Sequence, residues 1–247
     1  MEDLPPPIPA ATLVLMRPAP SGPPELLMME RPGHMAFAAG ALVFPGGRIE
    51  AQDHEIAAEP DDSAARIAAI RETLEETGIA AAIGGGDADK LARVRAGLLA
   101  GGVFADLLAT EGLGLDLDAL TPFTRWCPNF RETRRFDALF YLAEAPADAP
   151  EPHAQVGEAT RVFWASAASI LAELEAGEAH AIFPTRRNLE RLARFASFAE
   201  ARDDALRHKV QTITPWVERR DGADWVCIPE GIGYPVTAEL VETARRR

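Results

Sequence analysis

The sequence Phe44-Pro45-Gly46-Gly47-Arg48-Ile49-Glu50 closes a short apolar run with two adjacent glycines. Further along the chain, Arg71-Glu72-Thr73-Leu74-Glu75-Glu76-Thr77-Gly78-Ile79 gathers glutamates just before another glycine. The first stretch predicts a tight turn. The second predicts the end of a helix that carries concentrated negative charge.

The helix is predicted from its boundaries and its interior. Asp61, Asp62 and Ser63 are good N-cap residues, and no Pro or Gly interrupts residues 64–77. Gly78 stands where a left-handed C-cap belongs. We therefore expect a helix from about Ser63 to Thr77.

Helical spacing brings the acidic side chains onto one side. At about 100° per residue, Glu72, Glu75 and Glu76 fall within an arc of roughly 100°. Arg71 lies one turn before Glu75 and can pair with it. The opposite side is apolar and is expected to face a core through Ile67, Ile70 and Leu74.

Three carboxylates on a short arc repel one another, so a positive charge should compensate them. Hard cations such as Mg²⁺ take oxygen ligands, usually carboxylates, waters and substrate phosphates. A solvated helix face is the alternative for a bare Glu-x-x-Glu-Glu pattern. The upstream glycine turn, together with Arg71 and Gly78, favours a divalent-cation site that acts on a phosphate chain.

These two stretches resemble the Nudix box. Its family pattern is Gly, five residues, Glu, seven residues, Arg-Glu, an apolar residue, any residue, Glu-Glu, any residue, Gly and an apolar residue. Asp53 stands where the pattern has Glu, residues 54–70 intervene before Arg71 instead of seven residues, and Thr73 occupies an apolar position. We expect the extra residues, about 54–62, to form a loop. The matching residues are Gly47, Arg71, Glu72, Glu75, Glu76, Gly78 and Ile79.

A second similarity covers most of the chain. The stretch from Leu26 to Gly47 resembles the segment before the box in coenzyme A diphosphatases, with Ala36 and Met29 replacing an Arg and a Thr of that signature. The interrupted box, a helical insert after it and the strand that begins at Arg134 resemble the animal peroxisomal coenzyme A diphosphatase and its bacterial relatives. Arg31, Gly40 and residues 44–47 fall at the spacing of the signature.

The resemblance implies roles for individual residues. Glu75 and Glu76 would be metal ligands, with the Gly46 carbonyl as a further candidate. Glu72 would bind metal or take the proton from the attacking water, and Arg71 would orient the carboxylates. Some Nudix enzymes place the base on a distant loop, where Glu158 stands here; a plain surface glutamate is the alternative.

Arginines and aromatic residues are the candidates for substrate contacts. Guanidinium groups bind oxyanions with two parallel hydrogen bonds, so Arg31, Arg48, Arg134 and Arg135 are expected to contact phosphates. For the last two, an ion pair with Asp137 or Glu132 is the alternative. Trp126 and Phe130 would stack on a base or pack in the core.

Composition bounds the remaining possibilities. The chain has 247 residues, 47% hydrophobic and 26% charged, as expected of a soluble single domain spanning residues 1–247. Its net charge of −13 argues against nucleic-acid binding. Cys127 and Cys227 alone provide no disulfide framework, which favours a cytoplasmic location. No apolar run is long enough to span a membrane, and the N-terminus does not resemble a signal peptide. The final Arg-Arg-Arg is not a peroxisomal targeting signal. The spacing of the His residues does not predict a zinc site.

The pattern of elements predicts an α/β fold, the Nudix α/β/α sandwich with a mixed sheet. A helical insertion, about 84–118, should contain helices at 87–100 and 103–110 and lie over one side of the active site; a stabilising addition is the alternative. A further helix is expected at 184–198. Strands are expected at 10–17, 25–30, 41–44, 124–127, 136–142 and 160–164, a helix at 166–175, and a C-terminal hairpin from 210–216 and 225–228.

The function expected from this sequence is a Mg²⁺- or Mn²⁺-dependent hydrolase of a nucleoside diphosphate linked to another moiety. Coenzyme A or an acyl-coenzyme A, cut to 3′,5′-ADP and a phosphopantetheine product, is the favoured substrate. ADP-ribose, NADH or a dinucleotide is the alternative within the enzyme class. A non-catalytic nucleotide-binding regulatory module is the alternative outside it, and a homodimer is left open.

Overall fold

The structure is a computed structural model that describes residues 6–34, 38–57, 62–129 and 135–246. Its centre is an eight-stranded mixed sheet with the strand order β10–β7–β8–β1–β2–β3. Strand β4 also pairs with β1, and β9 pairs with β2. The strands of this sheet are β1 Ile8–Arg17, β2 Glu25–Glu30, β3 Leu42–Val43, β4 Gly46–Arg48, β7 Thr121–Trp126, β8 Phe136–Glu144, β9 Arg161–Ser166 and β10 Thr212–Ile213.

The register of the sheet explains its mixed character. Strands β1 and β2 form the expected antiparallel hairpin, with Arg17 opposite Glu25. On its other side β1 runs parallel to β8, with Thr12 opposite Phe140. Strand β4 continues from the glycine turn and pairs antiparallel with β1, bringing Gly46 opposite Thr12. The turn is therefore itself a sheet element.

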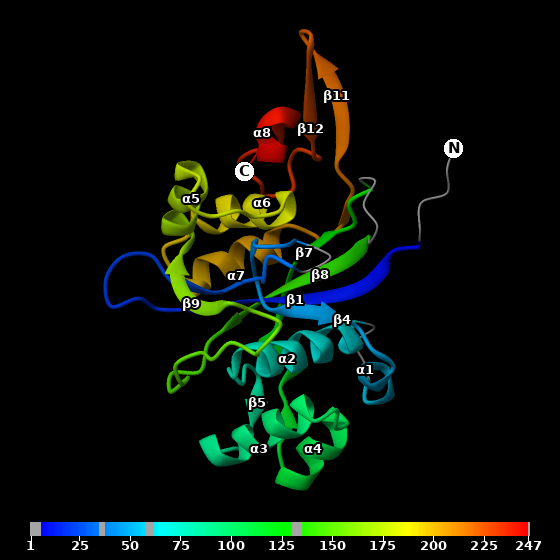
Figure 1. Ribbon diagram of the computed structural model, residues 1–247, viewed down its shortest axis with the longest axis vertical. Coiled ribbons are helices and arrows are strands. Elements are labelled where there is room, and N and C mark those ends of the chain that lie inside the picture. Colours follow the sequence, from blue (N-terminus) through cyan, green and yellow to red (C-terminus); the bar gives the residue numbers. More distant parts are fainter. Residues whose placement is uncertain (1–5, 35–37, 58–61, 130–134, 247) are drawn as a thin grey trace.

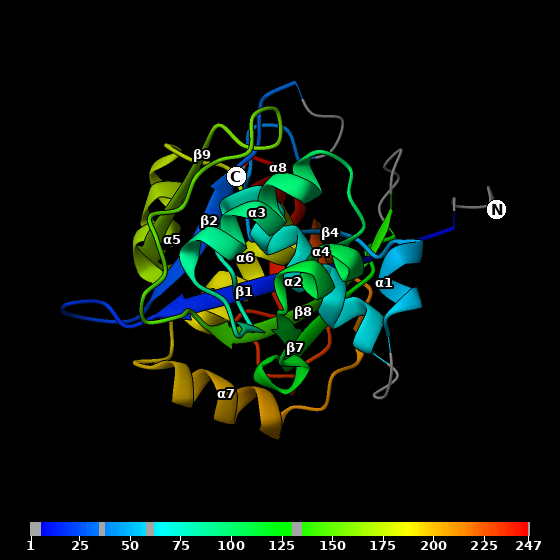
Figure 2. The same ribbon diagram turned by 90° about the horizontal axis from the view of Figure 1, so that it is seen from below.

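Helices cover both faces of the sheet, as Figures 1 and 2 show. Helix α2 lies on one face, and α5, α6 and α7 lie on the other. Successive side chains of β1 point to opposite faces of the sheet and contribute to both cores. Leu13 and Leu15 join the core beneath α2, whereas Val14 and Met16 join the core beneath the other helices. The α/β/α sandwich is confirmed. Its helices are α2 Ser63–Thr77, α5 Ala167–Ala176, α6 Phe183–Leu192 and α7 Phe198–Arg207.

The helical insert forms a separate layer beyond α2 (Figure 1). Its helices, α3 Ala88–Leu99 and α4 Phe104–Glu111, match the prediction closely. Val94 and Phe104 are buried and join the same core as α2. The insert is flanked by the short paired strands β5 Ile83–Gly84 and β6 Gly114–Leu115 and by a 3₁₀ turn at Leu117–Ala119.

The C-terminal part projects from the opposite end of the molecule (Figure 1). It forms a three-stranded antiparallel sheet, in which Asp221 and Gly222 make the turn between the first two strands with φ of +48° and +83°. Both values suit the tight hairpin turn that Asp-Gly favours. Its elements are β11 Trp216–Arg220, β12 Ala223–Cys227, β13 Ala238–Leu240 and α8 Val241–Arg246.

Four predictions require correction. The helix expected at 184–198 ends at Leu192, and a second helix, α7, begins after Ser197, whose hydroxyl accepts a hydrogen bond from Glu200 N. The predicted strand at 210–216 does not form the hairpin; its central part, β10, pairs parallel with β7, and β11 takes the hairpin position. The 54–62 loop is preceded and partly overlapped by the short helix α1, Ala51–Glu55. The glycine turn continues into β4.

Among the described residues, no helix is long and apolar enough to cross a membrane.

Candidate active site

Helix α2 carries the predicted carboxylates and has the predicted C-terminal cap. Gly78 adopts φ +77°, and its N–H bonds to Leu74 O at 2.9 Å. The unexpected Thr73 is buried, and its hydroxyl donates to Ala69 O at 2.7 Å. A polar residue is therefore tolerated at this apolar position because its hydrogen bond is made within the helix.

The glycine turn lies directly against the carboxylates. Gly46 N donates to Glu76 Oε2 at 3.0 Å. Gly47 leaves no room for a side chain, since a Cβ there would come within 2.7 Å of Glu72 Oε2. At Gly46, with φ +155°, a Cβ would lie 2.7 Å from Thr12 Cα. Both glycines are therefore required for the turn to fit between β1 and α2.

Arg71 is the organising cation of the cluster. Its Nε and Nη2 donate to Asp53 Oδ1 and Oδ2, each at 2.9 Å, and its Nη1 donates to Glu72 Oε1 at 2.9 Å. The expected pairing with Glu75 is present at 3.7 Å, and Nη2 also donates to Arg48 O at 3.1 Å. Asp53 is fully buried and accepts from Glu50 N at 2.8 Å, so α1 is built to present its carboxylate to Arg71.

The electrostatic setting favours neutralisation of the glutamates. Burial raises the pKa of Glu72 to about 7, although Arg71 opposes the shift. Burial, and then the charge of Glu72, raises the pKa of Glu76 well above its usual range, and burial also raises the pKa of Glu75. For Arg71, burial lowers the pKa, but the hydrogen bond to Asp53 and the nearby carboxylates outweigh it and raise the pKa. Burial and the charges of neighbouring glutamates both disfavour the ionised form of these carboxylates.

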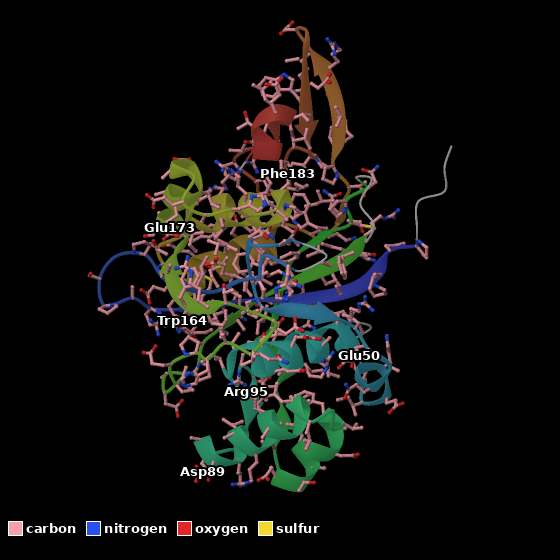
Figure 3. The ribbon with its side chains drawn as sticks, in the orientation of Figure 1. Glu50, Asp89, Arg95, Trp164, Glu173 and Phe183 are labelled. Carbon is pink, nitrogen blue, oxygen red and sulfur yellow. The ribbon has the colours of Figure 1, made fainter. Side chains whose placement is uncertain are left out.

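A cavity of about 580 Å³ opens beside the turn. Its acidic lining includes Glu50, Glu72, Glu76 and Glu158, while Glu75 and Arg71 lie outside the lining. Figure 3 labels Glu50 close to α1 and α2. The structure therefore brings together Gly46, Glu72, Glu76 and Glu158 from three separate segments. The basic lining consists of Arg31, Arg48, Arg135 and His34.

Two of these lining arginines contain a buried nitrogen. Among the described residues, Arg31 Nε and Arg135 Nε have no hydrogen-bond partner. An unpaired buried donor is costly, and an anionic ligand would relieve that cost. Asp137, an alternative partner for Arg135, is instead paired with Arg125 at 2.6 Å. Arg134, Glu132 and Phe130 lie outside the described residues.

An apolar wall closes the other side of the cavity. Trp126 is buried there, edge-on to Phe183 and Tyr234 at centroid distances of 6.1 and 5.6 Å. Its indole Nε1 donates to Tyr234 Oη at 3.1 Å. Trp126 therefore serves both as core and as wall, and its orientation is set by the C-terminal part of the chain. Phe44, Val43, Pro128, Phe136, Phe140, Ile182 and Pro184 complete the wall.

The helical insert does not cover this cavity. No described residue of 84–118 lines it. The insert packs instead behind α2, on the side away from the sheet (Figure 1). The expectation that it lies over one side of the site is therefore wrong, because its apolar side chains complete the core on the far side of α2.

The site also includes Asp53, Glu50 and Gln155. Of these, only Asp53 was considered as a site residue from the sequence. Five residues separate Asp53 from Gly47 of the glycine turn, but its pairing with Arg71 spans the insertion. Gln155 lines the cavity and bonds through its N–H to Glu76 O at 3.1 Å. No sequence pattern could have found Gln155, because a loop remote from the box carries it.

The fold is similar to that of known structures, although no family model matches the chain. A Nudix hydrolase from Alicyclobacillus acidocaldarius is similar over 80% of this chain and 96% of its own, with 29% identity and a TM-score of 0.70. The Nudix domain of Shewanella oneidensis NrtR, solved with ADP-ribose, covers 77% and 88%, with 14% identity and a TM-score of 0.46. A MutT protein from Methanosarcina mazei Go1 covers 78% and 97%, with 20% identity and a TM-score of 0.42.

The chain has the Nudix fold and is similar in structure to Nudix hydrolases, which are pyrophosphohydrolases. Nudix hydrolases depend on divalent metal ions. In this chain the fold carries an interrupted box, a helical insert and a C-terminal sheet.

The residues present fit a divalent ion of the magnesium type. No group of three or more His, Cys, Asp or Glu side chains within the described ranges forms a preassembled metal cluster. Mg²⁺ does not need one, because it commonly takes one or two carboxylates and completes its shell with water and substrate phosphates. Glu72 and Glu76 offer such a pair in one cavity.

Proposed function

We propose that this protein hydrolyses a phosphoanhydride bond in a nucleoside diphosphate linked to another moiety, with coenzyme A or an acyl-coenzyme A as the substrate. The observation that carries the proposal is the contact of the glycine turn with α2. It places Glu72 and Glu76 in one cavity with Arg31 and Arg135. Carboxylates for cations and guanidinium groups for phosphates are the two components that phosphoanhydride hydrolysis requires.

The roles follow from position. Glu72, Glu75 and Glu76, with the Gly46 carbonyl, would hold the divalent ion, Mg²⁺ or Mn²⁺. When bound, that ion supplies neutralisation of the phosphate charge. Arg71 would keep the glutamates oriented through its bonds to Asp53 and Glu72.

Water attacks one phosphorus, a new P–O bond forms, and the bond to the bridging oxygen breaks. The proton of the water passes to a carboxylate, Glu158 or Glu72, both of which line the cavity. The departing oxygen leaves as a phosphate monoester. For coenzyme A the two products are 3′,5′-ADP and 4′-phosphopantetheine.

Two kinds of lining residue would contact the substrate. Arg31, Arg48 and Arg135, together with Arg134, would bind the phosphates. The wall formed by Trp126 and its apolar neighbours would receive an aromatic base. The resemblance to coenzyme A diphosphatases over residues 26–47 supports coenzyme A over other diphosphates.

A panel of substrates tests the proposal. The purified protein is incubated with Mg²⁺ or Mn²⁺ and coenzyme A, acyl-coenzyme A, ADP-ribose, NADH or a dinucleotide, and the products are separated. We expect 3′,5′-ADP from coenzyme A and a loss of about 100-fold or more in kcat for Glu76→Gln. Glu178→Gln, an exposed carboxylate away from this cavity, is the matched control.

Each alternative has its own outcome. Release of AMP from ADP-ribose without cleavage of coenzyme A would show that the proposed substrate is wrong and that the proposed type of reaction is right. Binding of these ligands without turnover would indicate that the protein is a regulatory module and not an enzyme. Equal turnover by wild type and Glu76→Gln would contradict the role of the carboxylate.

A further inference from the structure

The end of α2 is capped by parts of the chain that are distant in sequence. The last carbonyl groups of a helix have no partner within it and must find one elsewhere. Gly78 N bonds to Leu74 O, and His153 N bonds to Thr77 O at 2.8 Å. Gln155 N bonds to Glu76 O at 3.1 Å. The loop 153–159 therefore docks on the helix that carries the glutamates.

The remaining carbonyl of this turn is capped by the helical insert. Arg95, on α3, donates through Nε to Glu75 O at 3.1 Å. Its Nη2 donates to His153 O at 2.8 Å. One guanidinium group thus joins the insert, the end of α2 and the docked loop. Figure 3 shows Arg95 between α3 and α2.

The contact with α2 leaves no spare room. A Cβ at Gly78 would lie 2.9 Å from Arg95 Nη1, so the guanidinium packs directly over the C-cap glycine. Gly78 is needed there both for its positive φ and for this close approach.

The docked loop carries two residues of the cavity. Gln155 O accepts hydrogen bonds from Glu158 N and Ala159 N, at 3.2 and 3.3 Å, which fold the loop into a tight turn. Gln155 and Glu158 both line the cavity. Between them lie Val156, which is 99% exposed, and Gly157, at φ +93°. The turn is held at its start by the hydrogen bonds to α2 and at its end by Thr160, whose N–H donates to Glu30 O at 2.8 Å.

We propose that Arg95 is a positioning residue, through which the helical insert fixes loop 153–159 against α2 so that Glu158 faces the cavity. This proposal rests on the proposed function in assigning Glu158 a part in the reaction. It gives the insert a role in the reaction, although the insert lines no described part of the cavity.

The test uses the full-length protein and a control from the same helix. Arg93 lies two residues before Arg95, is exposed and pairs within the insert, with Glu111 at 2.7 Å. Arg95→Ala and Arg93→Ala are compared by thermal unfolding, amide hydrogen exchange and steady-state kinetics. Arg95→Lys, which keeps the charge but not the fork, is the second variant if Arg95→Ala fails to fold.

Amide exchange is the readout that does not depend on the proposed function. We expect Arg95→Ala to speed exchange at His153 and Gln155 by about tenfold, while Arg93→Ala leaves it unchanged. Unchanged exchange in Arg95→Ala would overturn the proposal. This measurement is decisive even if the wild-type protein hydrolyses none of the substrates tested.

Kinetics test the link to Glu158. We expect Arg95→Ala to lower kcat by about tenfold or more with little change in KM, because a small displacement of a catalytic group is costly. In a Glu158→Gln background the same substitution should cause no further loss. Equal losses with and without Glu158, or a loss confined to KM, would contradict positioning of that carboxylate.

Discussion

Arg71 holds Asp53 through two parallel hydrogen bonds of 2.9 Å, one from Nε and one from Nη2, in a buried pair that joins α2 to the start of the interrupted box. The pair is made across residues 54–70, so the insertion leaves the centre of the site intact. Asp53 thereby accepts from both nitrogens on one edge of the Arg71 guanidinium, while Nη1 donates to Glu72.

Removing the charge of Asp53 should destabilise the protein. Asp53→Asn leaves a buried Arg71 with too little compensation, which costs about 3 kcal/mol in the free energy of unfolding. Urea unfolding measures this loss. Asp148→Asn, at an exposed position, is the control and should change the free energy by less than about 0.5 kcal/mol. A similar small change in Asp53→Asn would contradict the organising role of the pair.

Filling the glycine turn should damage activity. In Gly47→Ala the new Cβ meets the Glu72 carboxylate, so either the turn or the carboxylate must move. We expect kcat to fall by about 100-fold. Gly114→Ala adds the same methyl group in open space, and its kcat should match that of the wild type. If both variants retain full activity, the contact between turn and carboxylate is unimportant.

The orientation of Trp126 should depend on Tyr234. Tyr234→Phe removes the hydroxyl that accepts from the indole and bonds to Asn188 Oδ1 and Thr124 Oγ1. We expect a loss of about 1–3 kcal/mol in stability and a severalfold rise in KM for the substrate.

The matched control for this change lies on the other face of the sheet. Tyr141→Phe removes a hydroxyl that donates to Asp62 Oδ2 at 3.0 Å, beneath α2 and away from the wall. It should lower stability without raising KM. An equal rise in KM in both variants would show that the wall at Trp126 does not contact substrate.

Arg31 and Arg135 should govern affinity for the substrate. Arg31→Gln and Arg135→Gln each remove a cation with a buried, unpartnered nitrogen at the cavity. We expect KM to rise by about tenfold or more in each, because a charge-assisted hydrogen bond to phosphate contributes about 1.5–3 kcal/mol. Arg219→Gln, on the exposed C-terminal hairpin, is the control. Unchanged KM in Arg31→Gln and Arg135→Gln would place the phosphates elsewhere.

The sequence was sufficient for the parts of this structure that local patterns determine. Helix α2 and its Gly78 cap follow from spacing and from one left-handed position. The β1–β2 hairpin and the two insert helices follow from apolar periodicity in the same way. Acidic residues on adjacent turns of one helix share a side wherever the helix lies.

Tertiary placement accounts for most of what the sequence did not predict. The pairing of Asp53 with Arg71, the docking of Gln155 on α2 and the location of the insert behind the helix all join distant segments. The boundary between α6 and α7 could have been predicted from local sequence. Ser197 and Glu200 form a recognisable N-cap signal, although no Pro or Gly marks the break between the two helices. The Asp221-Gly222 turn was a readable signal of the same kind, and it makes β11, instead of residues 210–216, the first strand of the hairpin.

Metal binding tests the central claim most directly. Mn²⁺ binding to the metal-free protein is measured by electron paramagnetic resonance for wild type, Glu76→Gln and Glu178→Gln. The account predicts specific binding in wild type and Glu178→Gln, and an affinity at least about tenfold weaker in Glu76→Gln, since a buried carboxylate ligand is lost. Equal affinity in all three proteins would contradict it, because the ion would then be held somewhere other than beside the glycine turn.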